Sequence, residues 1–226
     1  MILTGHSHVK HGVKSMSAKA KAAGLPGTQP LPGEKERACD RIFNAACELF
    51  YRKGIRAVGI EAIAEKAHAT KMSLYRTFPS KDELVAQYLQ RESDRAFQRW
   101  DERLGAYSGD PRRQLSALFS ELACSGEDRN SRGCALANAA VELTDPEHPG
   151  RKIIEEHKAE LRSRLLRLCA DAGARDPAAL ADGLFLLMEG AFSSARTLGS
   201  SGPGNALAQA AQALIEAQLP KAPAGT

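Results

Sequence analysis

The sequence predicts an all-α protein in which a small N-terminal three-helix unit of the helix-turn-helix type precedes a larger helical domain. Apolar residues recur at helical spacing from Ile42 to Ile215, and no stretch shows a convincing strand pattern. Gly and Pro separate these stretches, where helices are expected to end or begin. The chain has 226 residues, which is enough for one or two domains with a sizeable core.

The first predicted helix ends near Gly54, and a shorter helix follows after a few residues. Glycine suits the left-handed backbone that often ends a helix. Each of the two helices carries one apolar face. The first face is formed by Ile42, Phe43, Ala46, Leu49 and Phe50, and the second by Ile60, Ile63, Ala64 and Ala67.

A third short helix is predicted directly after the link 68–70, which is too short for a loop and fits a tight turn between helices. Thr70 can cap this helix by accepting a hydrogen bond from its first free backbone N–H groups. Leu74 and Phe78 lie four residues apart, so both side chains can point into the core. Pro79 then ends the helix.

Further helices are expected after this unit. A capping box formed by Ser80 and Glu83 predicts the start of a long one. Asp110-Pro111 and Asp176-Pro177 are typical starts of two later ones. Apolar stripes at helical spacing occupy residues 84–100, 115–122, 134–143, 153–168, 180–191 and 207–215.

Composition divides the chain into a disordered basic tail (1–34), the three-helix unit (35–81), the larger helical domain (82–219) and a short flexible tail (220–226). Residues 1–33 hold four Lys and no acid, and residues 34–81 hold ten Lys and Arg against six Asp and Glu. Positive charge concentrated in this way suits contact with phosphate groups. The first tail also contains His6, His8 and His11, but no Cys or carboxylate accompanies them, so we expect no metal site. Met16 is an alternative start of the chain.

One segment carries a specific motif: IAEKA, then a three-residue turn, then K-x-S-L-Y-x-x-F-P-S-K-x-x-L. It resembles the N-terminal domain of the TetR/AcrR family of transcriptional regulators over roughly residues 42–84. Gly59 stands where the family usually has a capping Ser or Thr, and His68 where it usually has a Gly in the turn. Met72 replaces a frequent Gly on the third helix, so the base preference of relatives cannot be carried over.

The third helix is the expected reading element. A short helix with a lysine and hydroxyl groups at its leading end suits the major groove of DNA. Lys71 can donate to guanine or to phosphate, and the resemblance implies a DNA-backbone contact for Tyr75. The expected DNA-binding residues are Thr70, Lys71, Ser73, Tyr75, Arg76 and Lys81.

For the larger domain, the resemblance implies a ligand-binding and dimerisation role, with the helices at 177–198 and 204–218 forming the dimer interface. The expected protein is a ligand-responsive regulator, most often a repressor, that binds a palindromic double-stranded DNA operator as a homodimer and is released by a small molecule. We expect that effector to be mostly apolar. Candidate lining residues are Phe119, Leu122, Cys134, Leu136, His157, Phe185, Met188 and Phe192.

Other classes of protein are alternatives. An enzyme could pair Cys134 with His148 or His157, but the chain has no glycine-rich phosphate loop, nucleophile elbow or spaced carboxylate pair, so we expect no catalytic residues and no cofactor. A helical adaptor that binds protein and a thiol-based redox-sensing regulator using Cys124 and Cys134 are the other two alternatives. Without any CxxC pair, the five cysteines are expected to be buried and inert.

The expected location is the cytoplasm, with no membrane partner. No apolar run reaches the roughly 18 residues that a membrane span needs. The N-terminus lacks the apolar core of a signal peptide.

Overall fold

The computed structural model describes residues 37–125, 132–198, 202–203 and 206–220, and within them all regular secondary structure is helical. The predicted all-α class is therefore confirmed. Both tails beyond these ranges, the histidines of the first tail and the connection 126–131 lie outside the described residues. The helices are α1 (Ala38–Lys53), α2 (Ile60–Lys66), α3 (Lys71–Thr77), α4 (Lys81–Gly105), α5 (Pro111–Ser125), α6 (Ala135–Glu142), α7 (Pro149–Asp171), α8 (Pro177–Leu198) and α9 (Ala206–Gln218).

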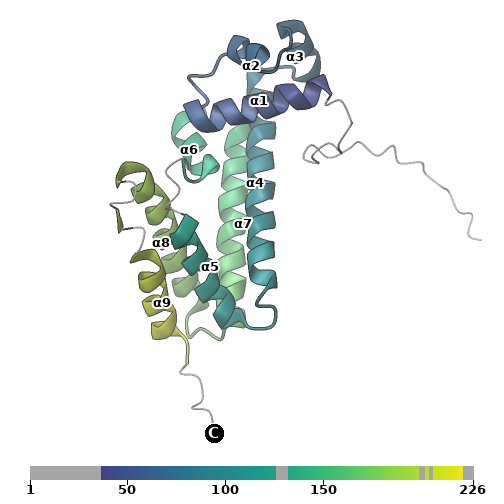
Figure 1. Cartoon of the computed structure of the whole chain (residues 1–226). Coiled ribbons are helices and arrows are strands. Elements are labelled where there is room, and N and C mark those ends of the chain that lie inside the picture. The colour runs from purple at the N-terminus through teal and green to yellow at the C-terminus, as the bar shows by residue number, and fades with distance from the viewer. Residues whose placement is uncertain (1–36, 126–131, 199–201, 204–205, 221–226) are drawn as a thin grey trace, which may run out of the picture.

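The three-helix unit α1–α3 lies across one end of the long pair α4 and α7, which run side by side (Figure 1). Helix α6 lies just below α1, and α5, α8 and α9 pack together along the other part of the molecule (Figure 1). Because α4 begins in the three-helix unit and ends among α5 and α7, it is a direct mechanical connection between the two parts.

Side-chain caps confirm the predicted helix starts. Ser80 Oγ accepts a hydrogen bond from the Glu83 backbone N–H at 3.0 Å. Asp110 Oδ1 accepts one from the Arg113 N–H, also at 3.0 Å, at the start of α5. Such caps satisfy N–H groups that have no partner inside the helix. At the other end of α1, Gly54 has φ +90°, as expected for a glycine that ends a helix.

Buried side chains form two clusters. The N-terminal core joins α1–α3 to the first half of α4, to α6 and to Ile154 of α7. The C-terminal core joins the second half of α4 to α5, α7, α8 and α9. Tyr88 and Trp100 lie on the same helix but in different cores. A shift of α4 along its axis would therefore disturb packing in both.

Helix α8 differs from the expectation that no apolar run is long enough to span a membrane. By length and composition alone, Pro177–Ala195 is apolar enough to cross a membrane, and only 22% of that window is buried. Its inner side contributes Leu180 and Leu184 to the C-terminal core, while Leu186 and Leu198 are 68% and 56% exposed. One face of α8 is thus packed, and Leu186 lies on the opposite face. Leu198 is on the same side as Leu180, eighteen positions earlier, and is exposed at the last position of the helix.

Candidate nucleic-acid interface

Local packing and capping fix the turn between α2 and α3. Ile63 and Leu74 are fully buried, so each helix is held by one apolar side chain in the N-terminal core. Thr70 caps α3 by accepting a hydrogen bond from the Ser73 N–H at 3.1 Å, as predicted. His68 adopts φ +49°, the left-handed backbone that a glycine would take at lower cost. Gly59 begins α2 without a side-chain cap.

The outer face of α3 carries most of the predicted DNA-binding residues. Lys71, Tyr75 and Arg76 are exposed, and Ser73 is half-buried. Tyr75 has 51% of its surface exposed, so its ring and hydroxyl are both accessible to a partner. Figure 1 shows α3 at the outer end of the molecule, remote from α5, α8 and α9.

An ion pair that was not anticipated holds Lys71. Its ammonium group donates to Glu61 Oε1, from the first turn of α2. The hydrogen bond from Lys71 holds the pKa of the Glu61 carboxyl below its ordinary value. The two residues lie ten positions apart in the sequence, on different helices. Neither helical periodicity nor a capping motif predicts a contact at this spacing. In the protein alone, therefore, one donor of the ammonium group faces a carboxylate, whose negative charge lies beside the expected DNA-binding face.

Lys81 lies apart from the face of α3, in the first turn of α4. Burial lowers the pKa of its ammonium group, while the nearby charges of Asp82 and Glu142 act in the opposite direction. A half-buried cation beside two carboxylates is held at the junction between the two parts of the chain. Its predicted contact with phosphate remains a prediction.

That junction joins α6 to α1. Glu142 Oε2 accepts a hydrogen bond from the Arg56 backbone N–H at 2.9 Å, and a Cβ placed on Gly54 would lie 3.0 Å from the other carboxylate oxygen. Tyr51 Oη accepts from the Arg132 backbone N–H at 2.8 Å, and Arg132 donates to the Tyr51 carbonyl at 3.1 Å. These contacts connect residues more than eighty positions apart, and sequence reasoning missed them because no local signal marks them.

A small cavity lies at the same junction. It is lined by Phe50, Tyr51, Ile55, Tyr88, Arg132, Ala135, Asn138, Ala139 and Glu142. It is too narrow for more than about one water molecule.

The predicted effector-binding residues divide between the two cores. Leu136 is buried in the N-terminal core, and Cys134 packs against that core. Phe119, Leu122, Phe185, Met188 and Phe192 belong to the C-terminal core or pack against it. Leu136 and Cys134 therefore lie in a different cluster from the other five residues. Their role in binding a ligand remains a prediction.

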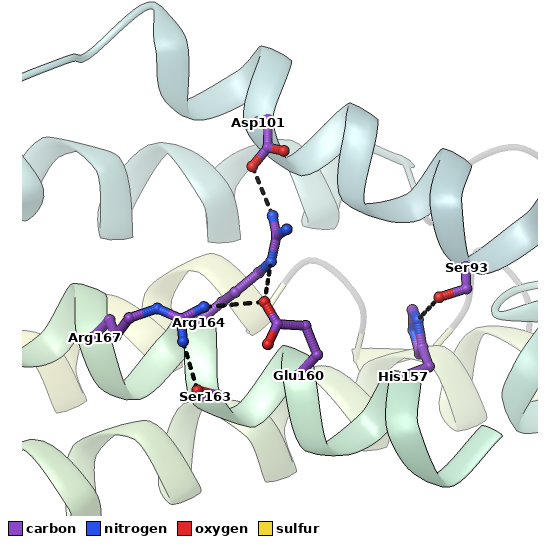
Figure 2. Close-up of polar contacts among 7 residues, drawn as sticks. All are labelled: Ser93, Asp101, His157, Glu160, Ser163, Arg164 and Arg167. Carbon is purple, nitrogen blue, oxygen red and sulfur yellow. Dashed lines mark hydrogen bonds and ion pairs between the residues drawn. The ribbon is translucent and has the colours of Figure 1, made fainter. Parts of the chain in front are cut away.

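His157 joins α7 to α4 inside the protein. Its Nδ1 lies 2.9 Å from Ser93 Oγ (Figure 2). The Phe97 ring packs on the imidazole with centroids 4.8 Å apart. Burial, aided by the charge of Lys158, lowers the pKa of His157 to about 4. The imidazole is therefore neutral at physiological pH.

A charged network continues along the same two helices toward their far ends. Arg164 donates to Asp101 Oδ1 at 2.6 Å and to Glu160 Oε1 at 2.8 Å, and Arg167 donates to the same Glu160 oxygen at 3.0 Å (Figure 2). The Arg164 guanidinium also lies 4.4 Å from the centre of the Phe97 ring. The network holds α4 and α7 together from outside the core.

The cysteine prediction was correct for two residues and wrong for three. Cys47 and Cys169 are buried, and burial raises the pKa of each thiol to about 12, which makes them poor nucleophiles. Cys124 is exposed near the end of α5, while Cys39 and Cys134 are partly exposed. Cys39 and Cys124 lie in the terminal turns of α1 and α5, and Cys134 is the residue just before α6, so each is covered only in part or not at all.

Comparison with known proteins identifies both parts of the chain. The family model described as "Bacterial regulatory proteins, tetR family" matches residues 42–88. A second model, "Tetracyclin repressor-like, C-terminal domain", matches residues 111–214. The chain belongs to the TetR family. Since members of this family are transcriptional regulators, the enzyme alternative is set aside.

The crystal structure of a TetR transcriptional regulator from Streptomyces avermitilis is 28% identical, covers 81% of this chain and 98% of its own, and has a TM-score of 0.73. Two curated relatives come from Mycolicibacterium smegmatis. The transcriptional activator FasR is 37% identical over 34% of this chain and 34% of its own length. The transcriptional repressor KstR is 34% identical over 36% of this chain and 40% of its own length. The chain thus spans well under half the length of these curated relatives, and their activities extend to it only as proposals.

Proposed function

We propose that this protein is a cytoplasmic, homodimeric transcriptional repressor that binds a palindromic operator through α3 and leaves it when a small molecule binds the C-terminal domain. The observation that carries the proposal is the face of α3 that bears Lys71, Tyr75 and Arg76, all exposed at the outer end of the fold. A rigid short helix that presents donors in this way fits the major groove.

Repression is proposed over activation from the resemblance to the TetR family. Among the relatives, KstR is named a repressor and FasR an activator. The direction of regulation is therefore tested separately from DNA binding, by comparing transcription from an operator-bearing promoter with and without the protein.

The dimer is supported by the apolar outer face of α8. Ala179, Leu186 and Gly190 share this face and are exposed, Leu186 to 68%, and a Cβ placed on Gly190 would meet no atom within 4 Å. Apolar faces of this kind are normally covered by another surface. In a two-fold dimer the two α3 helices would read half-sites about 34–36 Å apart, which makes the operator palindromic.

A single charge placed on this face tests the dimer. Leu186→Glu should convert the protein to a monomer in analytical ultracentrifugation, because the carboxylate would be buried without a partner. Val141 is also exposed, at 73%, but lies on α6. Val141→Glu is the matched control and should leave the mass unchanged. A wild-type monomer at micromolar concentration would contradict the proposed dimer.

Release from DNA requires that the C-terminal domain move the reading helices. Helix α4 passes through both cores. Glu142 of α6 contacts the α1–α2 link, and Arg132, just before α6, contacts α1. A ligand that displaces either helix would change the separation of the two α3 helices. The affinities for ligand and operator must then be coupled reciprocally.

DNA binding is tested by fluorescence anisotropy on DNA from upstream of the protein's own gene and on fragments selected from the whole genome, with excess nonspecific competitor. Lys71→Ala should weaken specific binding at least tenfold, because a donor to a base or phosphate is lost. Arg113→Ala is the control, since this side chain is 76% exposed at the start of α5, a helix remote from α3 (Figure 1). Binding that never exceeds the competitor on any fragment would favour the adaptor alternative.

Thiol-responsive regulation is the second candidate, favoured by the exposure of Cys124. Alkylation rates measured against pH would support it if the Cys124 or Cys134 thiol reacts faster than free cysteine at neutral pH. Rates equal to free cysteine would eliminate it.

A further inference from the structure

Helix α3 presents an apolar side chain at its leading end. Met72 is the second residue of α3 and is 83% exposed, more than any other large apolar side chain among the described residues. Successive helical residues turn by about 100°, so Met72 lies about 160° around the helix from the buried Leu74. Tyr75 and Arg76, three and four positions later, share its side of the helix.

The polar groups beside Met72 already have partners within the protein. The Thr70 hydroxyl bonds both the Ser73 N–H and Ser73 Oγ, each at 3.1 Å. Lys71 is paired with Glu61. The thioether of Met72 therefore lies beside a hydroxyl and an ammonium group that each already have a partner in the protein, and a base edge can meet it without displacing a protein contact.

We propose that Met72 is a specificity-determining residue that packs on the C5-methyl group of a thymine in each operator half-site. This inference rests on the proposed function. Thymine is the one base whose major-groove edge carries a methyl group, while the other bases are recognised there mainly through donors and acceptors. A flexible, polarisable thioether adapts to such a surface, and the contact removes apolar area of both partners from water.

The test removes only the methyl group. An operator is first selected from random duplexes with the wild-type protein, and each thymine of a half-site is then replaced in turn by deoxyuridine. Wild-type binding should weaken about fourfold at one thymine, the effect expected for one buried methyl group. In Met72→Ala, which keeps the helix intact, the same replacement should have no effect.

Two further variants sharpen the result. Val141→Ala removes another highly exposed apolar side chain, on α6, and should respond to deoxyuridine as the wild type does. Met72→Gln has a side chain of similar length that can pair with adenine, so selection with this variant should enrich adenine where the wild type selects thymine. Circular dichroism melting verifies that each variant is folded.

The outcomes separate the inference from the function on which it rests. If no sequence is enriched, DNA reading itself is wrong and the role of Met72 falls with it. If an operator is enriched but deoxyuridine acts equally on wild type and Met72→Ala, or acts at no position, the protein reads DNA without this contact and the inference alone is overturned.

Discussion

A single buried histidine should make this protein less stable in mild acid, because only the unfolded chain takes up a proton there. His157 is 5% exposed and bonded to Ser93, and its pKa is lowered to about 4, mainly because burial disfavours the charged ring. The unfolded chain takes up this proton near pH 6.5. Between these values the unfolded state binds more protons than the folded state, so stability is fully present above pH 6.5 and is lost as the pH falls toward 4.

The magnitude follows from this window. Between pH 7.5 and pH 5.0, about 1.5 pH units fall inside the window from pH 6.5 to pH 4. Each of these units lowers the free energy of unfolding by about 1.4 kcal/mol. With allowance for partial screening by solvent, we expect the free energy of unfolding to fall by about 1–2 kcal/mol through this residue. His157→Gln can still bond Ser93 but does not titrate, so it should lack this part of the loss.

Urea unfolding of both proteins at the two pH values measures the difference. The fluorescence of Trp100, the only tryptophan, reports the C-terminal core in which it is buried. All other titratable groups are common to wild type and variant, so their contributions cancel in the comparison. If both proteins lose the same free energy between pH 7.5 and pH 5.0, the reasoning from burial is refuted.

Three further predictions follow from the contacts. Glu61→Gln releases Lys71 and removes a negative charge near the DNA, so the affinity for DNA at low salt should rise severalfold in anisotropy measurements. Unchanged affinity would mean that the ion pair does not compete with DNA. Glu142→Gln weakens the bond to the Arg56 N–H, and hydrogen exchange of that amide should accelerate relative to amides within α7. Phe50→Ala leaves a cavity beside Tyr88 and should lower the free energy of unfolding by about 3–5 kcal/mol in urea titrations, whereas a loss below 1 kcal/mol would argue against a shared core.

The sequence alone determined the features that depend only on residues close to one another in the chain. The helix starts at Ser80 and Asp110, the cap at Thr70 and the left-handed turn before it were all predictable, because short-range hydrogen bonds and backbone preferences decide them. The face of α3 followed in the same way from the periodicity that buries Leu74.

Tertiary structure decided which of these local pieces meet. Glu61 reaches Lys71 because the turn sets the angle between α2 and α3, and Tyr51 meets Arg132 because α6 packs below α1. The predicted effector residues divided between two cores for the same reason. Helical periodicity states which side of a helix is apolar, but not which other helix covers it. That choice depends on the fit of side chains from distant parts of the chain, and no local pattern encodes it.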